Sequence, residues 1–294
     1  MKNGIRGAGT VVLFTTSTLL AVCLWAPAAS AGGPGDPIVA DVTGDDYEDL
    51  AILTERVLPE VGAAARQRVC EIVVQPGLPD GGFGDPQVYP YLTLPVDETY
   101  CPDMGTSTDI ERDPEDELVV AWFAGRPPLV DYDLITVDNF RATDFSKGLE
   151  QPSFIGTGNF DGQGVLDIYE WSDQGDGFAT FLNDGFGRFL PGPMRWCANP
   201  RSVELADFDA DRVQSAVISY FERCDDFSSG VVVVLEDGSV RHLERDPDGF
   251  ETWTVTVRDF DDDGRLDVRT VNDVTGQVHI FPGLGDNTFG ESQP

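Results

Sequence analysis

The chain has 294 residues, of which 41% are apolar, and it carries 52 acidic against 19 basic residues, for a formal net charge of −33 at pH 7. This length and apolar content suffice for a sizeable buried core. So negative a charge repels nucleic acid and anionic membrane surfaces, which we therefore exclude as partners, and bound cations would relieve the repulsion among the carboxylates.

Residues 1–31 are predicted to form a secretory signal peptide. Lys2 and Arg6 give a positive start, residues 11–25 are mostly apolar, and residues 29–31 read Ala-Ser-Ala, a small-residue cleavage site. The apolar stretch is too short to span a membrane. We expect residues 32–294 to be secreted as a single domain.

Two further features of the sequence concern attachment to a lipid and the organism that encodes the chain. A lipoprotein attached through Cys23 is the alternative, but Val22 stands where such a site needs a small residue. Lys2 and Lys147 are the only lysines, and the other basic residues are arginines, which favours a GC-rich, bacterial genome.

Five acidic loops recur along the chain at intervals of about 50 residues, the signature of a repeat architecture. Each loop precedes a short apolar run typical of a β-strand, such as Leu50–Leu53 after the first. The loops read DVTGDDYED (41–49), DIERDPEDE (109–117), NFDGQGVLD (159–167), DFDADRVQS (207–215) and DFDDDGRLD (259–267).

Oxygen-bearing side chains at loop positions 1, 3, 5 and 9 suit Ca²⁺, which takes six to eight oxygen ligands, and position 7 would add only a backbone carbonyl. A glycine at position 6, as Gly264 is, permits the sharp turn. An EF-hand would need helices and a glutamate at position 12, where the last loop has Thr270. A solvated acidic turn without an ion is the simpler alternative for any single copy.

The loops differ in how complete a site they offer. The last is complete, the third keeps oxygens and its glycine with fewer charges, and the first has Asp46 in place of the glycine. The fourth has Arg212 in place of the glycine and Ser215 at position 9, and Pro114 makes the second unsuited. The candidate metal residues are Asp41, Thr43, Asp45, Tyr47 and Asp49; Asn159, Asp161, Gln163, Val165 and Asp167; Asp207, Asp209 and Asp211; and Asp259, Asp261, Asp263, Arg265 and Asp267.

A second motif recurs along the chain together with the acidic loops. Glycine-rich turns with a phenylalanine recur at GLPDGGFG (Phe83), NDGFGRF (Phe189) and GLGDNTFG (Phe289). Together, the acidic loops and these turns resemble FG-GAP/VCBS repeats, the blades of integrin-α-type β-propellers, across essentially the whole mature chain. An insertion within residues 55–68 lengthens the first unit.

The resemblance implies an all-β fold, a propeller of about five four-stranded antiparallel blades. In each blade the calcium loop would join strands 1 and 2, and the Phe-Gly turn would lead into strand 4. Integrins have seven blades, so we expect either a ring closed with five, further weak blades, or completion by assembly; the five-blade ring is preferred. Apart from the resemblance, five units of strand and turn favour a propeller.

Four cysteines remain in the mature chain, an even number typical of disulfides in exported proteins, and the close spacing of a zinc site is absent. Four cysteines allow three pairings. With the blade assignment that the resemblance implies, the cysteines fall on two connections at the same face of a blade. This predicts the pairs Cys70–Cys101 and Cys197–Cys224.

The leading hypothesis for function is a secreted, calcium-stabilised, monomeric binding module for an extracellular glycan or protein. The predicted ligand face lies opposite the calcium loops, and its aromatic residues could stack on sugars, although packing between blades is an equal alternative; they are Trp122, Trp171, Trp196 and Tyr220. No catalytic constellation stands out. The alternative is a carbohydrate-active hydrolase or lyase using carboxylates near a central channel. A scaffold for a partner protein is a third possibility.

Overall fold

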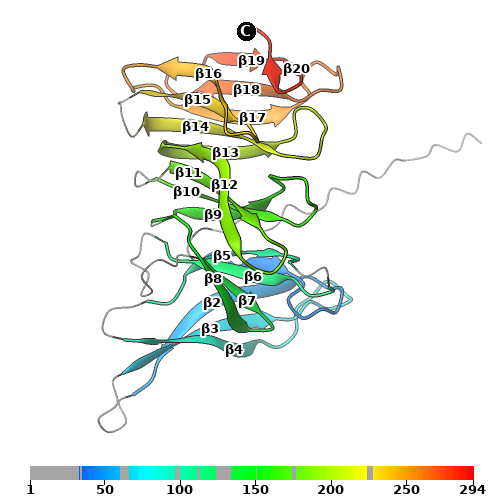
Figure 1. Ribbon diagram of the computed structural model, residues 1–294, viewed down its shortest axis with the longest axis vertical. Coiled ribbons are helices and arrows are strands. Elements are labelled where there is room, and N and C mark those ends of the chain that lie inside the picture. Colours follow the sequence, from blue (N-terminus) through cyan, green and yellow to red (C-terminus); the bar gives the residue numbers. More distant parts are fainter. Residues whose placement is uncertain are drawn as a thin grey trace, which may run out of the picture.

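The computed structural model describes residues 33, 35–59, 66–96, 100–110, 113–123, 134–149, 151–173, 177–223 and 228–294. The predicted signal peptide lies outside these residues. The described chain is all-β, as predicted, and consists of strands and their connections (Figure 1). It contains no helix long and apolar enough to cross a membrane.

Consecutive strands pair antiparallel into five sheets, which we number in chain order. Sheets 1 to 4 have four strands each, and sheet 5 has three with a short two-stranded ribbon beside it. Sheet 1 holds β1 (Ile38–Ala40), β2 (Asp49–Val57), β3 (Gln67–Gln75) and β4 (Gln87–Pro95); sheet 2 holds β5 (Met104–Thr108), β6 (Glu117–Ala121), β7 (Leu134–Asp138) and β8 (Arg141–Ser146); sheet 3 holds β9 (Phe154–Gly158), β10 (Asp167–Ser172), β11 (Gly177–Asn183) and β12 (Phe189–Trp196); sheet 4 holds β13 (Ala198–Ala206), β14 (Ser215–Arg223), β15 (Ser229–Val234) and β16 (Val240–Asp246); sheet 5 holds β17 (Trp253–Arg258), β18 (Asp267–Asn272) and β19 (Val278–Phe281), with β20 (Gly283–Gly285) and β21 (Thr288–Phe289) as the ribbon.

Four apolar clusters lie between successive sheets and form the core. Because neighbouring side chains on a strand point to opposite faces, each central strand supplies two clusters. In β6, Leu118 and Val120 pack toward sheet 1, whereas Val119 and Ala121 pack toward sheet 3. The near-continuous apolar runs of β6 and β15 follow from this burial on both faces.

The five sheets are arranged as an open stack. Strand contacts join each sheet to the next in chain order, and Figure 1 places sheets 1 and 5 at opposite ends of the long axis. The expectation that the ring closes with five blades is therefore wrong for this structure. The resemblance implied the four-stranded units, whereas ring closure depends on the small rotation between sheets, which no single repeat encodes.

The connections follow the predicted order within each sheet. Every acidic loop joins the first and second strands, and the turn that carries Phe83 or Phe189 leads from the third strand into the fourth. The insertion in the first unit lengthens β2 and β3 into nine-residue strands that form a projecting hairpin (Figure 1).

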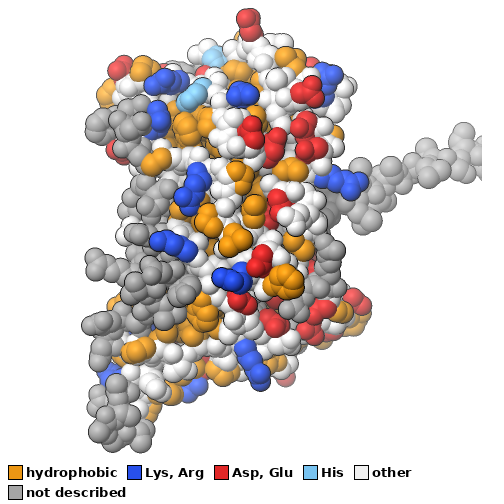
Figure 2. All heavy atoms as spheres, viewed as in Figure 1, with side chains coloured by type: hydrophobic (Ala, Val, Ile, Leu, Met, Phe, Trp, Pro, Cys, Tyr) orange, Lys and Arg blue, Asp and Glu red, His pale blue; other side chains and the backbone are white. Residues whose placement is uncertain are grey.

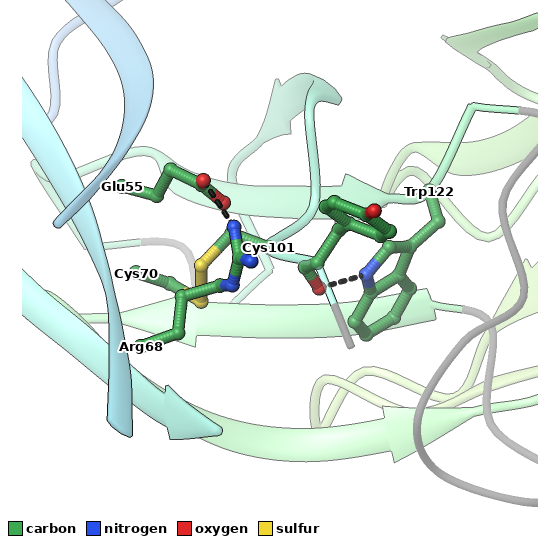
Figure 3. The surroundings of a disulfide bond; sticks show 6 residues. Glu55, Arg68, Cys70, Cys101 and Trp122 are labelled. Carbon is green, nitrogen blue, oxygen red and sulfur yellow. Dashed lines mark hydrogen bonds and ion pairs between the residues drawn. A yellow bond between two sulfur atoms is a disulfide. The ribbon is translucent and has the colours of Figure 1, made fainter. Parts of the chain in front are cut away.

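One predicted disulfide is confirmed. Cys70 and Cys101 are bonded, with their Cα atoms 5.4 Å apart, and both are buried between sheets 1 and 2 (Figure 3). Cys197 is also disulfide-bonded. Cys224 lies outside the described residues, so its pairing with Cys197 stays a prediction.

Candidate functional site

The last acidic loop, between β17 and β18, gathers three carboxylates. One oxygen from each of Asp259, Asp261 and Asp267 lies within 4.8 Å of the other two. Asp259 Oδ1 is buried and has no hydrogen-bond partner among the described residues. Since a buried carboxylate oxygen without a partner is costly, a cation could supply the partner that this atom lacks.

Backbone turns hold this loop in shape. The Gly264 amide donates to Asp259 Oδ2 (2.8 Å), and the Asp263 amide donates to Asp261 Oδ1 (3.1 Å). Gly264 has a φ of 86°, as its predicted role requires. Asp263 was predicted as a ligand, but it lies outside the three-carboxylate group: it accepts a hydrogen bond from the Arg265 amide and lies 3.9 Å from the Arg265 guanidinium.

The ninth-position carboxylate ties its loop to the strand ends of the sheet. Asp267 is buried and accepts the amide of Phe260 on one oxygen and that of Gly283 on the other, each at 2.8 Å. These two charge-assisted hydrogen bonds to the backbone give Asp267 a structural role that does not depend on a bound ion. Two other sheets repeat this pair of bonds: Asp49 with Thr43 and Gly77, and Asp167 with Phe160 and Asn183.

The fourth loop, between β13 and β14, forms a second carboxylate group. Oxygens of Asp207, Asp209 and Asp211 lie within 4.8 Å of one another. Burial, followed by the charge of Asp211, raises the pKa of Asp209, so a cation here would relieve an unfavourable carboxylate. Ala210 and Arg212 adopt positive φ, which confirms that this loop turns without the glycine, at some strain.

Sequence reasoning missed Glu236 as a neighbour of this group. Ser215 occupies the ninth position, and its hydroxyl bonds Glu236 Oε2 at 3.1 Å, so the carboxylate comes from the end of β15 instead. Asn287 donates to both Asp209 Oδ2 (2.8 Å) and Glu236. The acidic dipeptide Glu236-Asp237 after a four-valine run was the available signal.

The first and third loops do not form such a group among the described residues. In the first loop, both Asp41 oxygens accept amides of the loop itself, those of Gly44 (2.7 Å) and Asp46 (2.7 Å), and Asp49 accepts the amides of Thr43 and Gly77. The expectation that Asp41, Asp45 and Asp49 converge is therefore not met. In the third loop only two of the ligand side chains carry charge: Asp167, whose pKa burial raises to about 6, and Asp161, whose Oδ2 is buried without a partner.

Adjacent loops are also bonded to one another. Asn159 of the third loop exchanges hydrogen bonds with Gln214 of the fourth and donates its side-chain amide to the Arg212 carbonyl (2.6 Å). Asp41 and Asp116 repeat the exchange between the first two loops. The loops thus line one long edge of the stack, where Figure 2 shows acidic side chains gathered.

Glu117, at the ninth position of the second loop, is buried and accepts the Ile110 amide at 2.6 Å. Burial raises its pKa from 4.5 to about 7. Between these values the folded state holds a proton that the unfolded state releases, so this group makes stability fall as pH rises through that window.

Glu117→Gln is expected to be more stable than the parent at about pH 8 and nearly equal to it at about pH 4, because glutamine keeps an acceptor for Ile110 and cannot ionise. Thermal unfolding of both proteins across this range measures the difference. Glu291→Gln, the same change at an exposed glutamate near the end of the chain, is the control. A difference that stays constant with pH would contradict the assignment.

The predicted ligand-face aromatics lie largely in the core. Trp122 and Tyr220 are buried, and the Trp122 indole donates to the Tyr100 carbonyl at 2.7 Å (Figure 3). Trp171 stacks on Phe154 with ring centres 5.5 Å apart. Trp196 packs edge-on against Tyr220, with the Arg223 guanidinium over its ring. The alternative of packing between blades is therefore correct for Trp122 and Tyr220.

Two cavities nevertheless open on the side opposite the acidic loops. One, of about 300 Å³, lies beside the Cys70–Cys101 disulfide and is lined by Tyr100, Asp103, Trp122 and Phe123 among others. Tyr100 and Phe123 are the exposed rings that line it. Neither was proposed from the sequence as a ligand-binding residue; only their neighbours in the chain, Cys101 and Trp122, were singled out. The other, of about 340 Å³, is lined by residues including Arg195 and Trp196.

Both histidines lie near sheet-to-sheet contacts of the C-terminal half. His279 Nδ1 is 2.7 Å from Glu244 Oε1, across the junction of sheets 4 and 5. His242 packs edge-on against Trp196, and its pKa is lowered by burial and by Arg245 and Arg223. These contacts are those of packed strand residues, His242 in β16 and His279 in β19.

Comparison with protein-family models, with curated proteins and with solved structures finds no match to this chain.

Proposed function

We propose that this chain is a secreted, calcium-binding β-repeat protein of the FG-GAP/VCBS type that serves as an extracellular binding module for a glycan or a protein. The Asp259–Asp267 loop is the principal calcium site and the Asp207–Asp211 loop a second, weaker one. The loops without a carboxylate group serve as structural turns.

The observation that carries the calcium proposal is the buried, unpartnered Asp259 Oδ1 beside two further carboxylates. An all-oxygen donor set of three negative charges suits a hard divalent cation. Ca²⁺ is favoured over Mg²⁺, because Mg²⁺ demands a tighter octahedral shell and gives up water reluctantly. When bound, the cation would neutralise carboxylates in a chain of net charge −33.

The binding proposal is supported by the cavity beside the disulfide. Tyr100 is 69% exposed and Phe123 is 38% exposed, and both line a space of about 300 Å³. The Arg68 guanidinium lies over the Tyr100 ring, 4.8 Å from its centre, so a ligand would meet the exposed part of that ring. This volume is at the lower end of ligand pockets. Aromatic rings can stack on a sugar ring, and the Asp103 carboxylate beside them can accept hydrogen bonds from its hydroxyl groups.

An oligosaccharide array, followed by a turnover screen on the same sugars, tests this function. Retention without product is expected, and the double variant Tyr100→Ala/Phe123→Ala is expected to lose it. Phe186→Ala, an exposed ring on a turn of sheet 3, is the matched control. Saturable depolymerisation abolished by one carboxylate substitution would instead favour the hydrolase or lyase alternative.

A further inference from the structure

The two end sheets of the stack each leave one face without a partner sheet. Sheets 2, 3 and 4 place alternate residues of their central strands in two different apolar clusters. Sheets 1 and 5 each contribute to one cluster only. Their other faces, which we call the sheet-1 outer face and the sheet-5 outer face, are the equivalents of surfaces that every inner sheet buries.

The sheet-1 outer face is aliphatic near the acidic loop and polar toward the β2–β3 hairpin, where Thr54 pairs with Glu71 and Arg56 forms an ion pair with Glu71. Its residues belong to no apolar cluster, and their register places them side by side: Val39 pairs with Leu50, Ile52 with Val73, and Val73 with Val88. Val39, Ile52 and Val88 are 37%, 36% and 55% exposed. Repeat proteins that end in solvent usually carry a polar outer face on the terminal repeat, and this face departs from that pattern.

The sheet-5 outer face is mixed. Val271 pairs with Val278 and with Thr254, and Arg269 pairs with Ile280 and with Thr256. Val271, Val278 and Ile280 are half-buried and lie outside the cluster shared with sheet 4. Branched side chains, threonine methyl groups and the stem of an arginine can all cover an aliphatic surface.

We propose that this chain self-associates head to tail, the sheet-5 outer face of one copy packing on the sheet-1 outer face of the next. Within the chain, sheets pack face to face at four successive junctions. In the new contact, sheet 5 of one copy would pack on sheet 1 of the next copy in the same way as each sheet packs on the sheet that follows it. The two faces cannot meet within one copy, because they lie at opposite ends of the stack (Figure 1). Such a contact joins unlike surfaces and so continues into a filament or closes into a ring.

Electrostatics sets the conditions for association. Copies of a chain with net charge −33 repel one another, and salt screens that repulsion at distances beyond about 10 Å at 0.1 M. The acidic loops lie along a side edge of the stack and not on either outer face. Association is therefore expected to strengthen with ionic strength, the opposite of an interface held by ion pairs.

Sedimentation velocity over a wide range of concentration, at physiological salt, tests the proposal on three variants. Ile52→Lys disables the sheet-1 outer face, Ile280→Lys disables the sheet-5 outer face, and Phe186→Lys alters an exposed ring on the side of the stack. Circular dichroism confirms that each variant is folded. An ammonium buried against aliphatic side chains is expected to weaken association roughly a hundredfold or more.

The expected result is that the parent and Phe186→Lys form multimers as concentration rises, whereas Ile52→Lys and Ile280→Lys each stay monomeric. Mixing these two monomers should give a dimer that grows no further, because each retains the face that the other has lost. A parent chain that is monomeric at every concentration and salt would overturn the proposal. Self-association of Ile280→Lys alone would overturn the head-to-tail arrangement in favour of like faces pairing.

Discussion

Replacing both Cys70 and Cys101 with alanine is expected to lower the free energy of unfolding by about 3.5 kcal/mol, because the disulfide closes a loop between residues 31 apart in sequence. For a domain of this size the loss corresponds to a fall in melting temperature of roughly 10 °C. The bond joins β3 to the connection that enters sheet 2, so its loss also frees the chain around Tyr100 (Figure 3).

Chemical denaturation of the parent and the alanine pair measures this loss. The serine pair is the matched control, because it removes the same cross-link but adds two hydroxyls at positions that are buried. It should be less stable than the alanine pair, by the cost of burying polar groups. A loss of less than about 1 kcal/mol for the alanine pair would show that the cross-link contributes little to the folded state.

Millimolar Ca²⁺ added to chelator-treated protein is expected to raise the melting temperature. Binding to the folded state alone stabilises by about 2.7 kcal/mol at one hundred times Kd. Asp261→Asn should remove most of this rise, because it takes a charge from the group that contains the buried, unpartnered Asp259 oxygen. Mg²⁺ should stabilise less.

Two further variants rank the sites. Asp209→Asn should remove a smaller part of the rise, since Asn287 already donates a hydrogen bond to Asp209 Oδ2. Asp113→Asn should change almost nothing, because Asp113 is exposed and belongs to neither carboxylate group. Equal effects of all three substitutions would show that Ca²⁺ acts through general screening of charge and not through the loops.

Much of the local structure could be predicted from the sequence because each repeat carries its own signals. Short apolar runs marked the strands. The resemblance to FG-GAP/VCBS repeats implied that each acidic loop joins the first two strands and that the glycine-phenylalanine turn leads into the fourth. The pairing of Cys70 with Cys101 followed once these elements were placed.

The arrangement of the sheets and the completeness of each loop were less predictable. Whether five sheets close depends on rotations shared among many contacts, and the stack stays open. The Asp41 loop has three carboxylates in sequence, but they do not form a group like that of Asp207, Asp209 and Asp211, although loop amides bond both Asp41 and Asp207. Glu236 approaches the fourth loop only through the pairing of β14 with β15, which a linear motif does not contain.

Calorimetric titration of the chelator-treated chain with CaCl₂ tests the central claim most directly. Saturable heat is expected, its larger part lost in Asp261→Asn and its smaller part in Asp209→Asn. An absence of binding heat, together with a melting temperature that ignores both chelator and Ca²⁺, would contradict the claim that these loops hold calcium.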